Sequence, residues 1–168
     1  MPEAWLRGPI DQVDAYLQPA AHALVQARDD LARVGSGLAT AQLWLQPNGA
    51  ASVGYHLRHL GGSLDRLLTY ARGEQLTDAQ LAALKSETDP NAPRHDLPAL
   101  VDEARRAIDA ALEQIRATRR EELLEPREVG RARLPSTVLG LLTHAAEHTT
   151  RHVGQAITTS KIVAADLG

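Results

Sequence analysis

The sequence contains no cysteine and no phenylalanine. Without cysteine the chain cannot form disulfides, thiolate metal sites or iron–sulfur clusters, and it has no cysteine nucleophile. Aromatic residues make up only 3% of the chain, which is sparse for a strand-based core or for a surface that stacks nucleic-acid bases. No apolar run approaches the ~18 residues that span a bilayer, and the N-terminal stretch MPEAWLRGPIDQ does not have the apolar segment of a signal peptide. We therefore expect a soluble, cytoplasmic protein without a membrane partner.

An excess of positive charge is also missing. Lys and Arg total 18 against 21 Asp and Glu, a formal net charge of −3, which argues against broad binding to a phosphate backbone and hence against a nucleic-acid partner. Hydrophobic residues are 43% and charged residues 23% of the 168 residues, the balance of a globular protein. A chain of this length is about one domain, so we expect a single domain over residues 1–168.

Apolar residues, mostly Leu, Ala and Val, recur at spacings of three and four along four long segments, the pattern of amphipathic helices. Four such helices predict an all-α fold, a four-helix bundle. The expected helices cover about 19–34, 51–71, 97–117 and 135–160, with an extra short helix over 77–87 in the connection between the second and the third.

Several residues interrupt the expected helices or mark the connections between them. Pro19 interrupts the first periodic segment, so we expect a short helical piece before it. Trp44 is expected to anchor the turn that Pro47 begins. A pair of glycines at 61–62, inside the second helix, indicates either a close backbone neighbour or a kink. The charged residues 119–133 are expected to form a linker.

Histidines are concentrated in two of the expected helices. His144, His148 and His152 follow one another at intervals of four residues, so their side chains lie within about 80° of arc on the last helix. The apolar residues that flank them place this stripe toward the interior. His56 and His59 lie near the apolar face of the second helix. His22 and His95 fall outside these clusters and are interpreted as surface residues.

Two histidines four residues apart on a helix can both reach one metal ion, and a third from a facing helix completes three nitrogen ligands with open positions, as in catalytic sites. The alternative is a set of polar core residues that hydrogen-bond one another. Unpaired buried imidazole atoms would cost about 1–3 kcal/mol each, so convergence from two helices favours metal binding. Because the ligands must be deprotonated, we expect the metal to be lost below about pH 6.

Three sequence elements carry a resemblance to a known family: Trp44-x-x-Pro47, the run SVGYHLRHL at 52–60, and HTTRHVGQ at 148–155. Over nearly the whole chain, the sequence resembles the DinB/YfiT-like four-helix bundles of metal-dependent enzymes. The resemblance implies that His59, His148 and His152 hold a divalent metal ion, zinc or nickel. It also implies a homodimer.

The chain departs from the family pattern at two places. The family often has Arg directly after the last ligand, whereas here Val153 follows it and Arg151 precedes it. His56 and His144 are additional histidines, each one turn from an expected ligand. We do not expect either to be a primary ligand; they are interpreted as partners of the ligands, proton carriers or rim residues.

The resemblance also implies an activity, because characterised relatives include S-transferases and isomerases that use bacillithiol, mycothiol or glutathione. The expected function is transfer of a low-molecular-weight thiol to an electrophile, with the metal activating the sulfur. Metal-dependent hydrolysis is the rival enzymatic reading, but neither Glu147 nor Asp65 is placed as a general base. A non-catalytic, stress-related metal-binding bundle and a metal-free bundle are the remaining alternatives. The sequence assigns no catalytic residue.

Overall fold

The four long helices that the apolar spacing predicts are all present in the computed structural model, which describes residues 1–35, 37–89 and 91–165. A short helix, α4 (Asp78–Ser86), lies between the second and third of them, as expected. The prediction of an all-α four-helix bundle is therefore confirmed. The long helices are α1 (Gln18–Asp30), α3 (Val53–Ala71), α5 (Leu97–Ala117) and α6 (Val138–Ala165).

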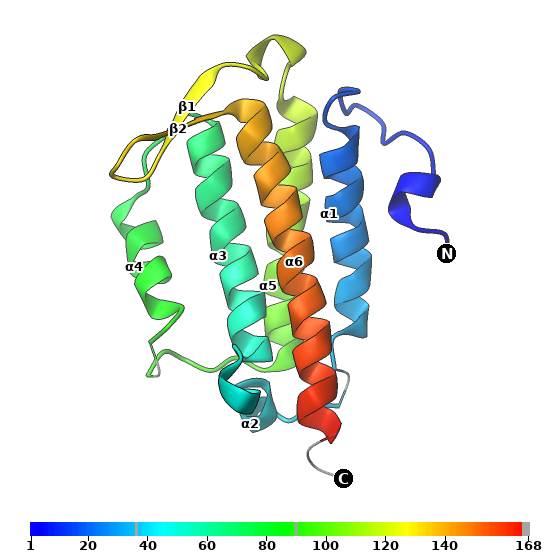
Figure 1. Cartoon of the computed structure of the whole chain (residues 1–168), viewed down its shortest axis with the longest axis vertical. Coiled ribbons are helices and arrows are strands. Elements are labelled where there is room, and N and C mark those ends of the chain that lie inside the picture. Colours follow the sequence, from blue (N-terminus) through cyan, green and yellow to red (C-terminus); the bar gives the residue numbers. More distant parts are fainter. Residues whose placement is uncertain (36, 90, 166–168) are drawn as a thin grey trace.

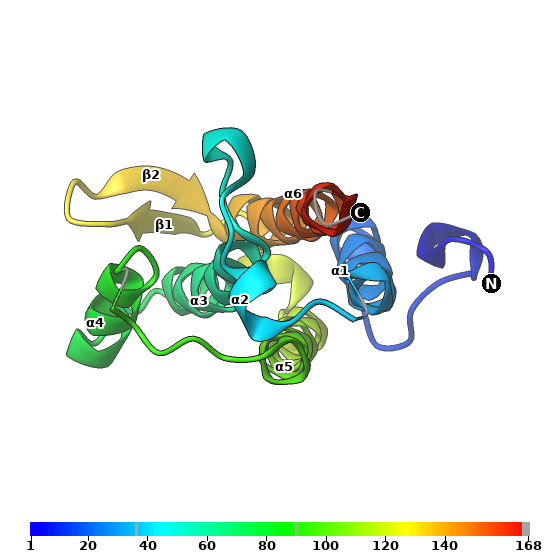
Figure 2. The ribbon, with the colours of Figure 1, turned by 90° about the horizontal axis from the view of Figure 1, so that it is seen from below.

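The long helices surround one apolar core (Figures 1 and 2). Helices α3 and α5 pack against each other, and so do α1 and α6, while α3–α6 and α1–α5 contacts complete the ring. Leu24, Leu57, Ile108 and Leu142, one from each long helix, are all almost completely buried. Because α3 and α6 run antiparallel and side by side (Figure 1), the inward faces of these two helices meet along much of their length.

Side-chain caps fix where three of the helices begin. The hydroxyl of Ser52 accepts a hydrogen bond from the Tyr55 backbone N–H at 3.1 Å, which confirms the expected cap of α3. Thr77 caps α4 in the same way, and the Asp96 carboxylate caps α5. The cap at Ser52 sets the first turn of α3, and thereby which of its residues face α6.

The N-terminal segment differs from the prediction. No helix forms over residues 9–17; apart from a short 3-10 turn at Ala4–Leu6, the chain reaches α1 through bends and turns. Gln12 has φ +62°, a left-handed conformation that a helix cannot contain. α1 begins at Gln18, with Pro19 in its first turn, where a missing N–H is harmless.

The expected linker over residues 119–133 is also wrong in part. Strand β1 (Pro126–Val129) pairs antiparallel with β2 (Leu134–Thr137) to form a small hairpin. The loop between the strands contains Gly130 and Arg133, both with positive φ, and such residues reverse the chain between paired strands. Because Pro135 belongs to β2, α6 begins at Val138 and not at Pro135.

Trp44 ends the short helix α2 (Thr40–Leu43) and packs against α3. Its ring lies so close to Gly54 that a Cβ there would overlap it, and the Arg58 guanidinium lies 4.6 Å above the ring centroid, a cation–π arrangement. Trp44 therefore joins the α2 turn to the N-terminal part of α3. Among the described residues, no helix combines the length and the apolar character needed to cross a membrane.

Candidate metal centre

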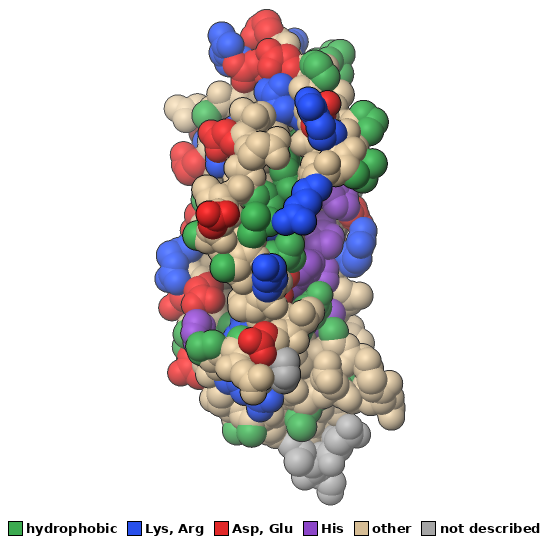
Figure 3. Space-filling model, turned by 90° about the vertical axis from the view of Figure 1, so that its left-hand side faces the viewer, with side chains coloured by type: hydrophobic (Ala, Val, Ile, Leu, Met, Phe, Trp, Pro, Cys, Tyr) green, Lys and Arg blue, Asp and Glu red, His purple; other side chains and the backbone are tan. Residues whose placement is uncertain are grey.

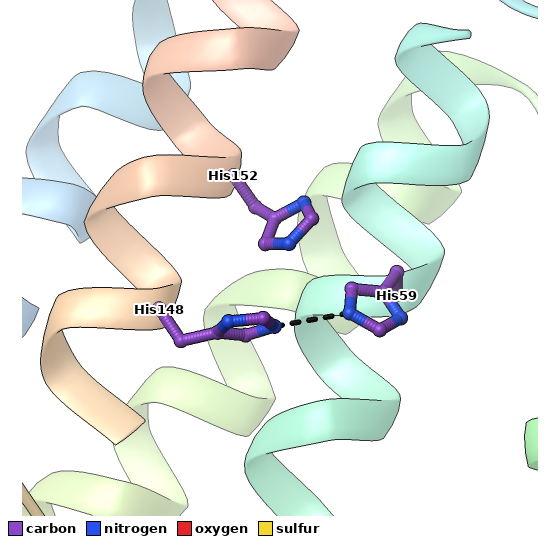
Figure 4. A group of neighbouring side chains, drawn as sticks. All are labelled: His59, His148 and His152. Carbon is purple, nitrogen blue, oxygen red and sulfur yellow. Dashed lines mark hydrogen bonds between the residues drawn. The ribbon is translucent and has the colours of Figure 1, made fainter. Parts of the chain in front are cut away.

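The packing of α3 against α6 brings together the three histidines that were predicted as metal ligands. Each of His59, His148 and His152 offers one ring nitrogen, and these three atoms lie within 4.8 Å of one another (Figure 4). The Nε2 atoms of His59 and His148 are 3.0 Å apart. The His152 ring centroid lies 4.6 Å from that of His59 and 4.5 Å from that of His148. The three rings therefore lie close together in the interface between α3 and α6.

This donor set fits one divalent ion. Imidazole nitrogens bind zinc at about 2.0–2.1 Å, so two nitrogens on the same ion lie about 3–3.4 Å apart. The 3.0 Å between the Nε2 atoms of His59 and His148 falls in that range. Three imidazoles also suit zinc, nickel and copper better than the hard ions calcium and magnesium, which prefer oxygen ligands.

The histidines are not explained as a self-contained hydrogen-bond network. The Nδ1 atom of His148 is buried and has no hydrogen-bond partner among the described residues. An unpaired buried polar atom costs about 1–3 kcal/mol, and a network selected only for core stability would avoid that cost. The hydrogen bonds among the described residues therefore do not satisfy every ring nitrogen of the cluster.

Burial favours the neutral form of His56, His148 and His152. Burial, reinforced by the neighbouring His59, lowers the pKa of His56 and of His148. The same causes, with His148 also nearby, lower the pKa of His152 to about 3. Neutral imidazole is the form that binds metal, so these side chains are in the competent protonation state at pH 7.

We expect the metal-free protein to lose stability as the pH falls below about 6.5. The pKa of His152 is about 3 in the folded protein against an ordinary 6.5. Between these values the unfolded chain binds more protons than the folded one, so the free energy of unfolding decreases with falling pH. Urea unfolding between pH 7 and pH 5 measures the slope in a range where the carboxylates do not yet titrate. The His152→Gln variant should show a shallower slope; equal slopes, or a flat profile for the unaltered chain, would contradict the prediction.

Glu87, which sequence reasoning missed, lies behind His59. It follows the C-terminal end of α4, and its side chain is only 4% exposed. Its Oε2 accepts a hydrogen bond from His59 Nδ1 at 2.7 Å, and its Oε1 accepts one from Arg66 at 2.6 Å. Burial alone would raise the pKa of the Glu87 carboxyl, but the hydrogen bonds from His59 and Arg66 outweigh it and lower the pKa. The carboxylate therefore holds the proton of His59 on Nδ1 and leaves Nε2 facing α6, an arrangement common behind metal-bound histidines.

The double glycine in α3 is explained by the same carboxylate. A Cβ on Gly62 would overlap Oε1 of Glu87, whereas a Cβ on Gly61 would meet only the Ala107 methyl, at 4.0 Å. α3 is one continuous helix across both glycines, and the close neighbour of Gly62 is a side chain, not the backbone that was the alternative to a kink. Gly62 provides the space in which Glu87 reaches His59 and Arg66.

The two additional histidines lie in different surroundings. His56 is buried, and its Nδ1 lies 3.1 Å from Nδ1 of His152. This contact leaves Nε2 of His152 for the other rings, so His56 acts as a partner of a predicted ligand. His144 is half exposed, with its ring centroid 5.4 Å from that of His148. His144 is therefore a rim residue.

The remaining candidates lie away from the cluster. His22 bonds the Gly8 backbone carbonyl, and His95 faces Glu103 on the surface, as expected for residues outside the site. Glu147 pairs with Arg151, whose hydrogen bond lowers the pKa of that carboxyl, and Asp65 accepts a hydrogen bond from Gln80. Neither carboxylate is directed at the three histidines.

The chain is similar to a known protein family. A family model described as DinB superfamily matches residues 23–156, about four fifths of the chain. The matched range contains all three clustered histidines, as well as Glu87 and Arg66. No curated protein matches the sequence.

Proposed function

Since the chain belongs to the DinB superfamily, we propose that it is a divalent-metal protein that transfers a low-molecular-weight thiol to an electrophile. Its ligands are His59, His148 and His152, and its metal is zinc or nickel. The observation that carries the proposal is the convergence of three ring nitrogens within 4.8 Å. When bound, such an ion supplies a Lewis acid with open positions, which favours the thiolate form of a thiol that it contacts.

The residues around the cluster indicate a preorganised metal site. His59 is held by Glu87 and His152 by His56, so two of the three rings have a fixed orientation before any ligand arrives. Partners of this kind orient metal ligands and raise their affinity for the ion. Three neutral ligands also leave the full charge of the ion available to an anionic sulfur.

The electrostatics favour thiol transfer over hydrolysis. A bound ion can ionise water by itself, but hydrolysis is faster with a general base near the reacting water. The carboxylate that contacts the cluster, Glu87, accepts hydrogen bonds from both His59 and Arg66, which lower its pKa and make it a weak base. A thiol has less need of such a base, because its pKa of about 8.5 is close to neutrality before any ion binds it. In the proposed reaction, a sulfur–carbon bond forms as the carbon–leaving-group bond breaks, and the thiol proton passes to solvent.

The test is a thiol-transfer assay on protein without an affinity tag, loaded with zinc or nickel. Glutathione, bacillithiol and mycothiol are each offered with 1-chloro-2,4-dinitrobenzene, and the conjugate is measured by its absorbance. We expect conjugation with at least one thiol to stop when a chelator removes the metal and to return when the metal is restored. The His22→Ala variant, altered outside the cluster, should retain the activity. Stoichiometric metal with no conjugation and no thiol binding would contradict the proposal and favour a non-catalytic metal-binding bundle.

A further inference from the structure

We propose that a groove beside the candidate metal centre binds the apolar part of the electrophile. The reaction named here rests on the proposed function, whereas the apolar side chains of the groove lie outside the set of proposed metal ligands. Its volume is about 240 Å³, and it runs between α3, α4 and the first half of α6. Figure 3 shows histidine side chains reaching this face of the molecule beside hydrophobic ones. The groove is lined by His59, His144 and His148 at one side and by Ser63, Arg66, Leu67, Tyr70, Leu76 and Leu84.

Two polar side chains of the groove already have partners within the protein. The Ser63 hydroxyl donates a hydrogen bond to the Leu60 carbonyl at 3.0 Å. The Arg66 guanidinium is committed to Glu87. A polar group of a ligand would have to displace these bonds, and burying it unpaired would cost free energy. Neither of these two side chains is therefore free to bind a polar group of the occupant.

The apolar side chains of the groove are its available contact surface. Leu84 is 40% exposed although it is a large hydrophobic residue, and Leu67 and Leu76 are half-buried. An alkyl or aryl group placed against these leucines would cover the apolar area that they leave in water. Because the same groove is lined by His59 and His148, a ligand seated there has one end at the candidate metal centre.

The polarity of the groove indicates which of the two reactants it receives. The thiols named above carry several charged or hydroxyl groups and match an apolar wall poorly. The electrophile is the reactant that can carry an alkyl or aryl group. At about 240 Å³ the groove is smaller than the ~300–1,000 Å³ pockets that enclose drug-sized ligands. The structure therefore assigns this position to a small electrophile with a short apolar group.

The test measures how affinity depends on the length of an apolar chain. The probes are n-alkylhydroxamic acids from acetohydroxamic to octanohydroxamic acid, whose head group binds zinc and whose tail is the only variable. Isothermal titration calorimetry on the zinc-loaded protein should show about two- to fourfold tighter binding per added methylene over the first few carbons. The Leu84→Ser variant should bind acetohydroxamic acid as the unaltered chain does but lose most of the gain with length. Leu45→Ser, which changes an exposed leucine outside the groove, is the matched control and should keep the full gain.

The outcomes separate this inference from the proposed function. Acetohydroxamic acid that binds with no gain along the series would overturn the role of the groove and leave the metal centre intact. A gain that Leu84→Ser and Leu45→Ser retain equally would overturn it as well. Failure of every probe to bind would contradict both the open metal centre and the groove. If Leu84→Ser changes the molar mass in light scattering, the leucines form a contact between subunits and the inference is wrong.

Discussion

The His148→Ala and His152→Ala variants are expected to contain almost no metal, against about one zinc or nickel ion per chain in the unaltered protein. Each variant removes one of three nitrogens that converge within 4.8 Å. Loss of a ligand should cost more than the 10–100-fold in affinity that loss of a ligand's outer partner costs. The measurement is metal content by mass spectrometry, on protein without an affinity tag that has been refilled with zinc, nickel or manganese.

The matched control for these variants is His144→Ala, which removes an imidazole from the same stripe of α6. His144 is half exposed and lies outside the three-residue cluster, so its removal should leave the metal content unchanged. Equal metal content in His148→Ala and the unaltered chain would exclude His148 as a ligand. Equal loss in all three variants would mean that the site is not the one described.

The Glu87→Gln variant is expected to bind metal about 10–100-fold more weakly and to lose about 3 kcal/mol of stability even without metal. The substitution keeps the size of the side chain but removes the charge that Arg66 and His59 contact in a largely buried position. Affinity is measured by competition with a chelator, and stability by urea unfolding of the metal-free protein. Glu103→Gln is the control: it alters a carboxylate that faces His95 on the surface, where an ion pair contributes at most about 1 kcal/mol.

Substitutions of Gly61 and Gly62 in α3 also test the position of the Glu87 carboxylate. Gly62→Ala places a methyl group where the Glu87 carboxylate lies, so it should weaken metal binding and stability in the same direction as Glu87→Gln. Gly61→Ala has room and should be neutral, or stabilising by up to about 1 kcal/mol. Wild-type behaviour of Gly62→Ala would show that Glu87 does not occupy the position described.

The helices could be predicted because their signal is local. Apolar residues three and four positions apart mark the buried face of each helix, and Ser52 marks the start of α3. The hairpin over residues 126–137 was missed because each strand is only four residues long and contains a proline, without the β-branched pattern that identifies strands. Its turn depends on backbone conformations at Gly130 and Arg133 that no spacing rule reveals.

In the candidate site, too, local spacing predicts some of the residues and only the fold brings the others together. His148 and His152 are one helical turn apart, so their proximity follows from the sequence. The expected packing of two apolar faces indicated a third imidazole from the second helix, and the family resemblance identified it as His59. Glu87 could not be found in this way, because it lies 28 residues from His59 and reaches it from the end of another helix. Glu147 and Asp65 lie near the histidines in the sequence, whereas Glu87 lies near His59 only in the folded chain. The signal that was present is Gly62, whose missing side chain leaves room for that carboxylate.

The attachment of α4 has a thermodynamic consequence for the whole site. None of the nine residues of α4, all of which the structure describes, is buried, so this helix gains little from the core. The residue that follows it, Glu87, is buried against His59 and Arg66. The hydrogen bond between Glu87 and His59 therefore contributes both to the packing of α4 and to the orientation of His59. Because the two share this interaction, whatever stabilises one stabilises the other by the same free energy. An ion that fixed His59 would therefore also hold α4 and Leu84, so occupancy of the proposed centre would change the affinity of the groove proposed for the electrophile.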